Sequence, residues 1–215
     1  MASYVLQPKP GLRDVVPSLQ RPDKAMISNL RTARAAIALG VCLLTMQFGC
    51  IGEAHAKPML VVAIGADNVH GMGRGKRRSG GVFENEAFPA QLQELLRARG
   101  IDAEVINAGV AGDTTRGMLD RLDSAVPEGT RVVIVDRANG NDKNEGSKDQ
   151  QDDYLQQIQE RLEVRHSAVI ILPKWKKIPG LLEHRDSDGH HFTAEGHAII
   201  ANYLLPKVLA LLGTK

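Results

Sequence analysis

MLVVAIGADN, Met59 to Asn68, is an apolar run that ends on a glycine and is followed, after one alanine, by two polar side chains. An unbroken apolar run of this length is typical of a parallel strand that helices cover on both faces. Sheets of this kind bind their ligands beyond the carboxyl ends of the strands. Asp67, just past the end of this predicted strand, is therefore a candidate functional residue.

Strand and helix patterns alternate along the rest of the chain. Strands are predicted at 59–65, 103–109, 131–136 and 167–173, and helices at 88–100, 112–126, 151–164 and 193–212. Alternation with short connections predicts an α/β fold with a parallel sheet, right-handed crossovers and helices on both faces. A fifth strand would have to lie between Pro173 and Ser187, where the sequence shows no convincing strand pattern.

Size and charge limit the possible partners. With 215 residues, 43% of them hydrophobic, the chain fits one α/β domain and an extension. The formal net charge is only +2. This balance gives no reason to expect nucleic acid or an anionic membrane as a partner.

The region before Lys57 has the features of a secretory signal. Residues 26–56 contain arginines, an apolar run from Ala35 to about Ile51, and the small-residue motif Ala54-His55-Ala56. We expect cleavage after Ala56, a periplasmic or secreted product, and no stable membrane insertion after cleavage. Residues 1–25 precede a second methionine, Met26, and are interpreted as an extension from a mis-called start. The mature domain would then comprise residues 57–215.

Four short polar blocks lie where the predicted sheet would end. They are GADN at 65–68, NAGVAGDTT at 107–115, NGND at 139–142 and DGHH at 188–191. In this order and spacing the blocks resemble those of the SGNH or GDSL hydrolase family, and the resemblance covers essentially Met59 to the C-terminus. It implies a three-layer α/β/α sandwich of flavodoxin-like topology with a parallel sheet of four to five strands, which the alternation of elements independently permits.

The resemblance also implies a set of site residues. Asp188 and His191 match the family's acid and base, whereas Gly112 and Asn141 match two donors of its oxyanion hole, to which the backbone N–H at position 67 would add a third. The catalytic serine of the family falls on Asp67. The site therefore departs from the family pattern at its nucleophile.

Asp67 can be interpreted in two ways. A carboxylate serves as the nucleophile in some hydrolases, and with His191 it could also activate water. Its charge would nevertheless repel the oxyanion that the nearby donors are arranged to hold. The sequence thus leaves open whether the protein is an active enzyme.

By resemblance, the expected function is exported ester hydrolysis of the lysophospholipase, arylesterase or thioesterase class, on a small ester or acyl substrate and without a metal or organic cofactor. The alternative is a non-catalytic binding protein that keeps the fold and the cleft. A third hypothesis, a metal-dependent hydrolase, rests on clustered acidic and histidine residues, although no fixed-spacing motif such as HExxH is present. These residues are His184, Asp186, Asp188, His190, His191 and His197.

Overall fold

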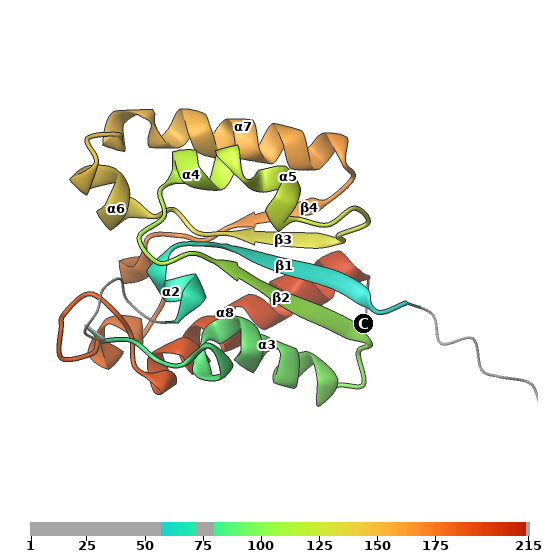
Figure 1. Ribbon diagram of the computed structural model, residues 1–215. Helices are drawn as coiled ribbons and strands as arrows, with labels where there is room; N and C mark the ends of the chain where they lie inside the picture. The colour runs from blue at the N-terminus through green and yellow to red at the C-terminus, as the bar shows by residue number, and fades with distance from the viewer. Residues whose placement is uncertain (1–56, 72–79, 214–215) are drawn as a thin grey trace, which may run out of the picture. The chain divides into compact units, whose positions relative to one another are not determined.

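The computed structural model describes residues 57–71 and 80–213, which form the layered domain of Figure 1. The predicted signal segment at 26–56 and the predicted extension at 1–25 lie outside the described residues. Both remain predictions. Within the described ranges, no helix is long and apolar enough to cross a membrane.

A four-stranded sheet forms the middle layer, and all its pairings are parallel. The strand order is β2-β1-β3-β4, with β1 at Met59–Gly65, β2 at Ala103–Gly109, β3 at Val132–Val135 and β4 at Ala168–Ile171. The α/β prediction and the four predicted strands are confirmed. In place of a fifth strand, residues 173–187 form two 3₁₀ turns, η3 at Trp175–Lys177 and η4 at Leu181–His184.

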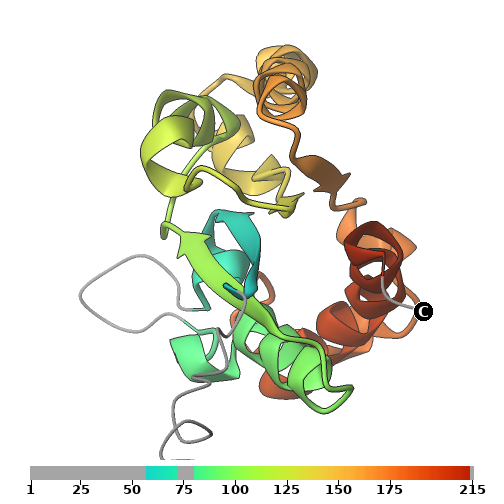
Figure 2. The same ribbon diagram turned by 90° about the vertical axis from the view of Figure 1, so that its right-hand side faces the viewer.

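Helices cover both faces of the sheet (Figures 1 and 2). On one face lie α3 (Phe88–Arg97) and α8 (Ala194–Leu212); on the other lie α4 (Thr115–Asp120), α5 (Leu122–Ala125) and α7 (Gln151–Val164). The helix predicted at 112–126 is shorter than expected and is divided at Arg121. Its N-cap is Thr114, whose hydroxyl accepts a hydrogen bond from the Gly117 N–H at 3.1 Å.

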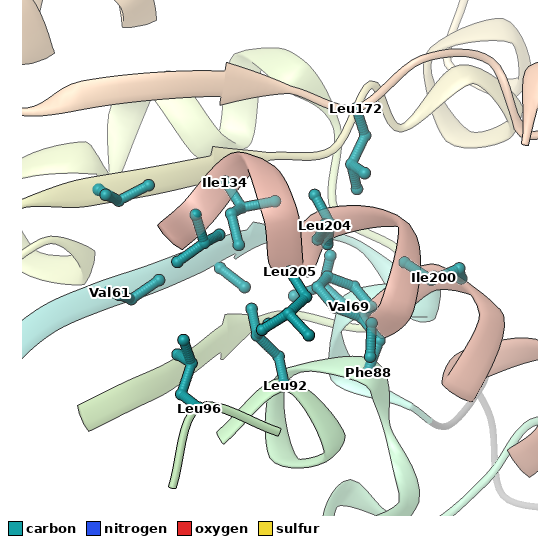
Figure 3. Packing of buried hydrophobic residues seen from close by; sticks show 14 of the residues in the cluster. Val61, Val69, Phe88, Leu92, Leu96, Ile134, Leu172, Ile200, Leu204 and Leu205 are labelled. Atoms are coloured by element: carbon teal, nitrogen blue, oxygen red, sulfur yellow. The ribbon is translucent and has the colours of Figure 1, made fainter. Parts of the chain in front are cut away.

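Alternate residues of β1 supply two separate cores. Val61 and Ala63 pack in the cluster that contains α3 and α8, whereas Val62 and Ile64 pack in the cluster that contains α4 and α7. All four are fully buried. Figure 3 shows the first cluster, in which side chains of α3 and α8 meet beside the sheet. Burial on both faces explains why the sequence of this strand shows no polar alternation.

The carboxyl ends of β1 and β2 are level, because Gly65 pairs with Gly109. Short helices follow at this edge, α2 (Asp67–His70) after β1 and α6 (Asn139–Asn144) after β3. Two further 3₁₀ turns, η1 (Glu84–Glu86) and η2 (Lys148–Gln150), precede α3 and α7. The predicted site residues therefore belong to one edge of the sheet.

Candidate active site

Four of the five predicted site residues line one cavity at the carboxyl edge of the sheet, and the fifth, Asp188, contacts His191. The cavity has a volume of about 490 Å³, and Asp67, Gly112, Asn141 and His191 all line it. These residues come from α2, the loop after β2, α6 and the loop before α8. Asp67 is the first residue of α2, so its backbone N–H has no partner within that helix.

The side chain of Asp67 is held by two of the three donors that the sequence assigned to an oxyanion hole, those of Gly112 and Asn141. The Gly112 N–H donates to Asp67 Oδ1 at 2.9 Å, and Asn141 Nδ2 donates to Asp67 Oδ2 at 2.8 Å. Gly112 has a positive φ of 76°, a conformation that glycine adopts without strain. The carboxylate of the chain itself thus occupies the donors that would stabilise a negatively charged substrate oxygen in a hydrolase.

Asp188 and His191 form a hydrogen-bonded pair. Asp188 Oδ2 contacts His191 Nδ1, and Asp188 Oδ1 accepts from the backbone N–H groups of His190 at 2.9 Å and His191 at 3.0 Å. Partial burial acts to raise the pKa of Asp188, but these hydrogen bonds outweigh it and lower that pKa to about 2. Asp188 is therefore ionised at neutral pH and orients the imidazole, leaving His191 Nε2 to act on a substrate or on water.

A partly buried ion pair holds the loop that carries Gly112. Arg121 Nε contacts Asp113 Oδ2 at 2.8 Å, and the same guanidinium donates to the Gly65 carbonyl at 3.2 Å. The Asp113 carbonyl accepts from Asn141 Nδ2 at 2.9 Å, so this loop also orients the second donor. Burial raises the pKa of Asp113, although the hydrogen bond from Arg121 opposes that change. Sequence reasoning assigned no role to Arg121.

Asp142 anchors the helix that carries Asn141. Its fully buried carboxylate accepts from Thr115 N at 2.9 Å and Thr115 Oγ1 at 3.0 Å, and it also accepts from Gln151 Nε2. These contacts join α6 to the first residues of α4 and α7. The sequence marked the NGND block but did not indicate that its aspartate is a structural anchor.

A second carboxylate, Asp136, lies on the cavity wall. It follows β3 directly and is 5% exposed, and its Oδ1 accepts from the Arg137 N–H at 2.7 Å. Burial raises its pKa to about 6, and the charge of Asp67 adds to that effect. Sequence reasoning missed Asp136 as a site residue, although its place at a strand end is the signal that singled out Asp67.

The histidine and acidic residues of the metal hypothesis are not gathered at one site. His197 is fully buried, and its Nδ1 accepts from the Phe88 N–H at 3.1 Å. Asp186 Oδ2 instead accepts from the Gly81 N–H at 2.8 Å. Within 57–71 and 80–213, no group of three or more histidine, cysteine or acidic side chains is arranged to hold a metal ion.

Arg185 and Trp175 line the same cavity as His191. Arg185 donates to the Gly189 carbonyl at 2.8 Å, and its guanidinium lies 5.3 Å from the centre of the Phe192 ring. Trp175 packs edge-on against that ring, with ring centres 5.5 Å apart. A positive charge and an aromatic side chain therefore form part of the wall of the cavity that His191 also lines.

Comparisons with known proteins give a short sequence match and similar folds. No family model matches the chain. A segment of 62 residues is 36% identical to Esterase TesA of Pseudomonas aeruginosa, and this segment spans 31% of the length of that relative and 29% of this chain. The match therefore covers about a third of the relative's length and leaves most of both chains uncompared.

Solved structures match over much more of the chain. A crystal structure of TesA matches with a TM-score of 0.58 and 19% identity, over 71% of this chain and 99% of that one. The psychrotrophic esterase EstA of Pseudoalteromonas sp. gives 0.56 and 17% identity, over 72% and 99%. A lipolytic protein of the G-D-S-L family from Desulfitobacterium hafniense gives 0.52 and 19% identity, over 69% and 98%. The resemblance to SGNH hydrolases that the four blocks indicated is thus confirmed in the fold.

Proposed function

We propose that this protein is an exported hydrolase of the SGNH type that takes a small ester in the cavity beside Asp67, and that this aspartate impairs its hydrolysis of acyl esters. The observation that carries the proposal is the pair of hydrogen bonds from Gly112 and Asn141 to the Asp67 carboxylate. The esterase names of the similar proteins support the substrate class. Lysophospholipid, aryl ester and thioester remain the candidate substrates.

The impairment follows from the chemistry of acyl transfer. Attack on an ester carbonyl creates a negative oxygen, which needs hydrogen-bond donors that are already in place. Here the Asp67 carboxylate accepts from those donors, so an ester carbonyl must compete with the carboxylate for them. The pair of Asp188 and His191 is nevertheless intact and can act as a general base. At the position of the nucleophile, the site has the Asp67 carboxylate in place of a serine hydroxyl.

The Asp67→Ser variant tests this proposal. A serine at this position would supply the hydroxyl and release the donors on Gly112 and Asn141, so we expect hydrolysis of 4-nitrophenyl acetate to increase by at least roughly 10²-fold. We also expect the serine variant, but not wild type, to react covalently with an alkyl phosphonate. Asp67→Asn is the matched control, because it removes the charge without adding a nucleophile.

Three outcomes separate the alternatives. An active serine variant that loses its activity when His191→Ala is added would support the proposal. A folded serine variant as inactive as Asp67→Asn would contradict it. If that inactive variant and wild type both bind a non-hydrolysable ester analogue in calorimetry, the non-catalytic binding protein is the better description.

Export is a separate part of the proposal and has its own test. The arginines, apolar run and A-x-A motif within 26–56 support secretion and cleavage after Ala56. We expect the exported product to begin at Lys57 when its N-terminus is sequenced. A product that retains Met26 or Ala35 would contradict this part without affecting the proposed chemistry.

A further inference from the structure

Asp67 is a poor nucleophile toward the carbonyl carbon of an ester and a suitable one toward an electrophilic saturated carbon. If a carboxylate attacks an ester carbonyl, the tetrahedral intermediate carries a carboxylate and an alkoxide as possible leaving groups. The carboxylate is by far the better leaving group, so the intermediate returns to its starting materials. Attack on a saturated carbon is different, because it forms an ordinary ester between Asp67 and the substrate.

An ester at Asp67 is the species that the surrounding residues are equipped to hydrolyse. The Gly112 N–H already lies 2.9 Å from Asp67 Oδ1, and Asn141 Nδ2 lies 2.8 Å from Asp67 Oδ2. Whichever oxygen is alkylated, the other remains a carbonyl oxygen with its own donor in place. That donor would stabilise the oxyanion formed when water attacks Asp67 Cγ.

The base for that water lines the same cavity. His191 is held through Nδ1 by the ionised carboxylate of Asp188, and both His191 and Asp67 line the cavity of about 490 Å³. The arrangement therefore supplies a nucleophile, oxyanion donors and a general base for the hydrolysis of an enzyme-bound ester.

We propose that Asp67 is a catalytic nucleophile toward a polar substrate with an electrophilic saturated carbon, of the epoxide class, and that Gly112, Asn141 and His191 hydrolyse the resulting alkyl ester. The inference rests on the proposed hydrolase cavity and names a different substrate class for it. Polar side chains of the cavity wall, among them Asn68, Asn139 and Asn144, favour a polar substrate over a purely hydrocarbon one.

The reaction balances in two steps. In the first, a lone pair of an Asp67 oxygen forms a bond to a ring carbon, the ring C–O bond breaks with its electrons going to oxygen, and that oxygen takes a proton from solvent. In the second, His191 takes a proton from water as the hydroxide adds to Asp67 Cγ. The intermediate then collapses, the alkoxide leaves and takes the proton from His191, and Asp67 returns its proton to solvent. The net reaction is epoxide plus water to diol.

The proposal is tested on the full-length protein with glycidol, a small polar epoxide, as the probe. In ¹⁸O-labelled water, a single turnover of wild type should place the heavy oxygen in the Asp67 carboxylate, as detected by mass spectrometry of the peptide that contains it. His191→Gln should slow the second step by roughly 10²–10⁴-fold, so the covalent adduct should accumulate on Asp67. Asp67→Asn should give neither adduct nor diol.

Opposite outcomes overturn the proposal. Heavy oxygen found only in the diol and never in Asp67 would show direct attack by water. A folded His191→Gln variant without an adduct, or with an adduct only at another residue, would exclude Asp67 as the nucleophile. If His191→Gln does not fold, Asp188→Asn serves as the second variant, because it leaves the imidazole in place without the carboxylate that orients it.

Failure of this proposal differs from failure of the proposed ester hydrolase. An esterase-active Asp67→Ser variant together with an unlabelled wild type would overturn only the alkyl chemistry. A labelled wild type together with an inactive serine variant would overturn only the ester chemistry. Absence of both activities in folded proteins would contradict both.

Discussion

Gly65 shows how a single residue sets the geometry of the site. An added Cβ at this position would lie 2.2 Å from Val69 Cγ2 and 2.6 Å from Asp136 Cβ. The chain can turn from β1 into α2 only because this side chain is absent. Gly65 thereby fixes the position of Asp67, two residues further on, against the loop that carries Gly112.

Gly65→Ala should lower the free energy of unfolding by about 1–3 kcal/mol, because it overpacks a filled region. Gly140→Ala is the matched control, since its added Cβ meets nothing within 4 Å and the position lies in α6. Alanine there should be neutral or stabilising by up to about 1 kcal/mol. Urea denaturation of the two variants measures the difference. Equal effects would contradict the close packing at Gly65.

At the scale of elements, prediction from sequence worked where local pattern determines structure. The unbroken apolar run at 59–65 correctly predicted a buried strand. The polar blocks at 65–68, 107–115 and 139–142 correctly marked where strands end. Contacts between distant elements were not predictable in this way. The pairing of Arg121 with Asp113, and the anchoring of α6 by Asp142 through Thr115 and Gln151, depend on how helices pack, which no local spacing encodes.

The end of α7 provides an element-scale test. His166 N donates to the Glu163 carbonyl at 2.9 Å and Ser167 N to the Leu162 carbonyl at 3.0 Å, the hydrogen-bond pattern of a helix stop that favours glycine. His166 is exposed and has a φ of 58°, which is strained for a residue with a Cβ.

His166→Gly should therefore raise the free energy of unfolding by about 1 kcal/mol. His166→Ala keeps the Cβ and should leave stability close to that of wild type, which makes it the control for loss of the imidazole. Thermal denaturation of both variants checks the expectation. Equal stabilisation in the alanine variant would show that the imidazole, not the backbone strain, is responsible.

For the whole molecule, two buried groups should give opposite dependences of stability on pH. Burial, reinforced by the charge of His191, lowers the pKa of His197 from 6.5 to about 4, so the stability linked to His197 is present above pH 6.5 and is lost as pH falls through about 4. Burial raises the pKa of Asp136 from 3.8 to about 6, so the stability linked to Asp136 is present below pH 3.8 and is lost as pH rises through about 6. Between about pH 4 and about pH 6 the two pH dependences of stability largely cancel.

Substitution of either group should therefore expose the dependence of the other. Relative to wild type, His197→Asn should make stability fall more steeply as pH rises from 4 to 6, and Asp136→Asn should make it rise more steeply, by up to about 1.4 kcal/mol per pH unit in each case. Both variants also change packing, which shifts stability at every pH and leaves the slope as the informative quantity. Urea denaturation at several pH values measures that slope. If the two variants change the slope in the same direction, at least one of the two groups does not have the buried environment described above. The position of Asp136 on the cavity wall beside Asp67 would then need revision.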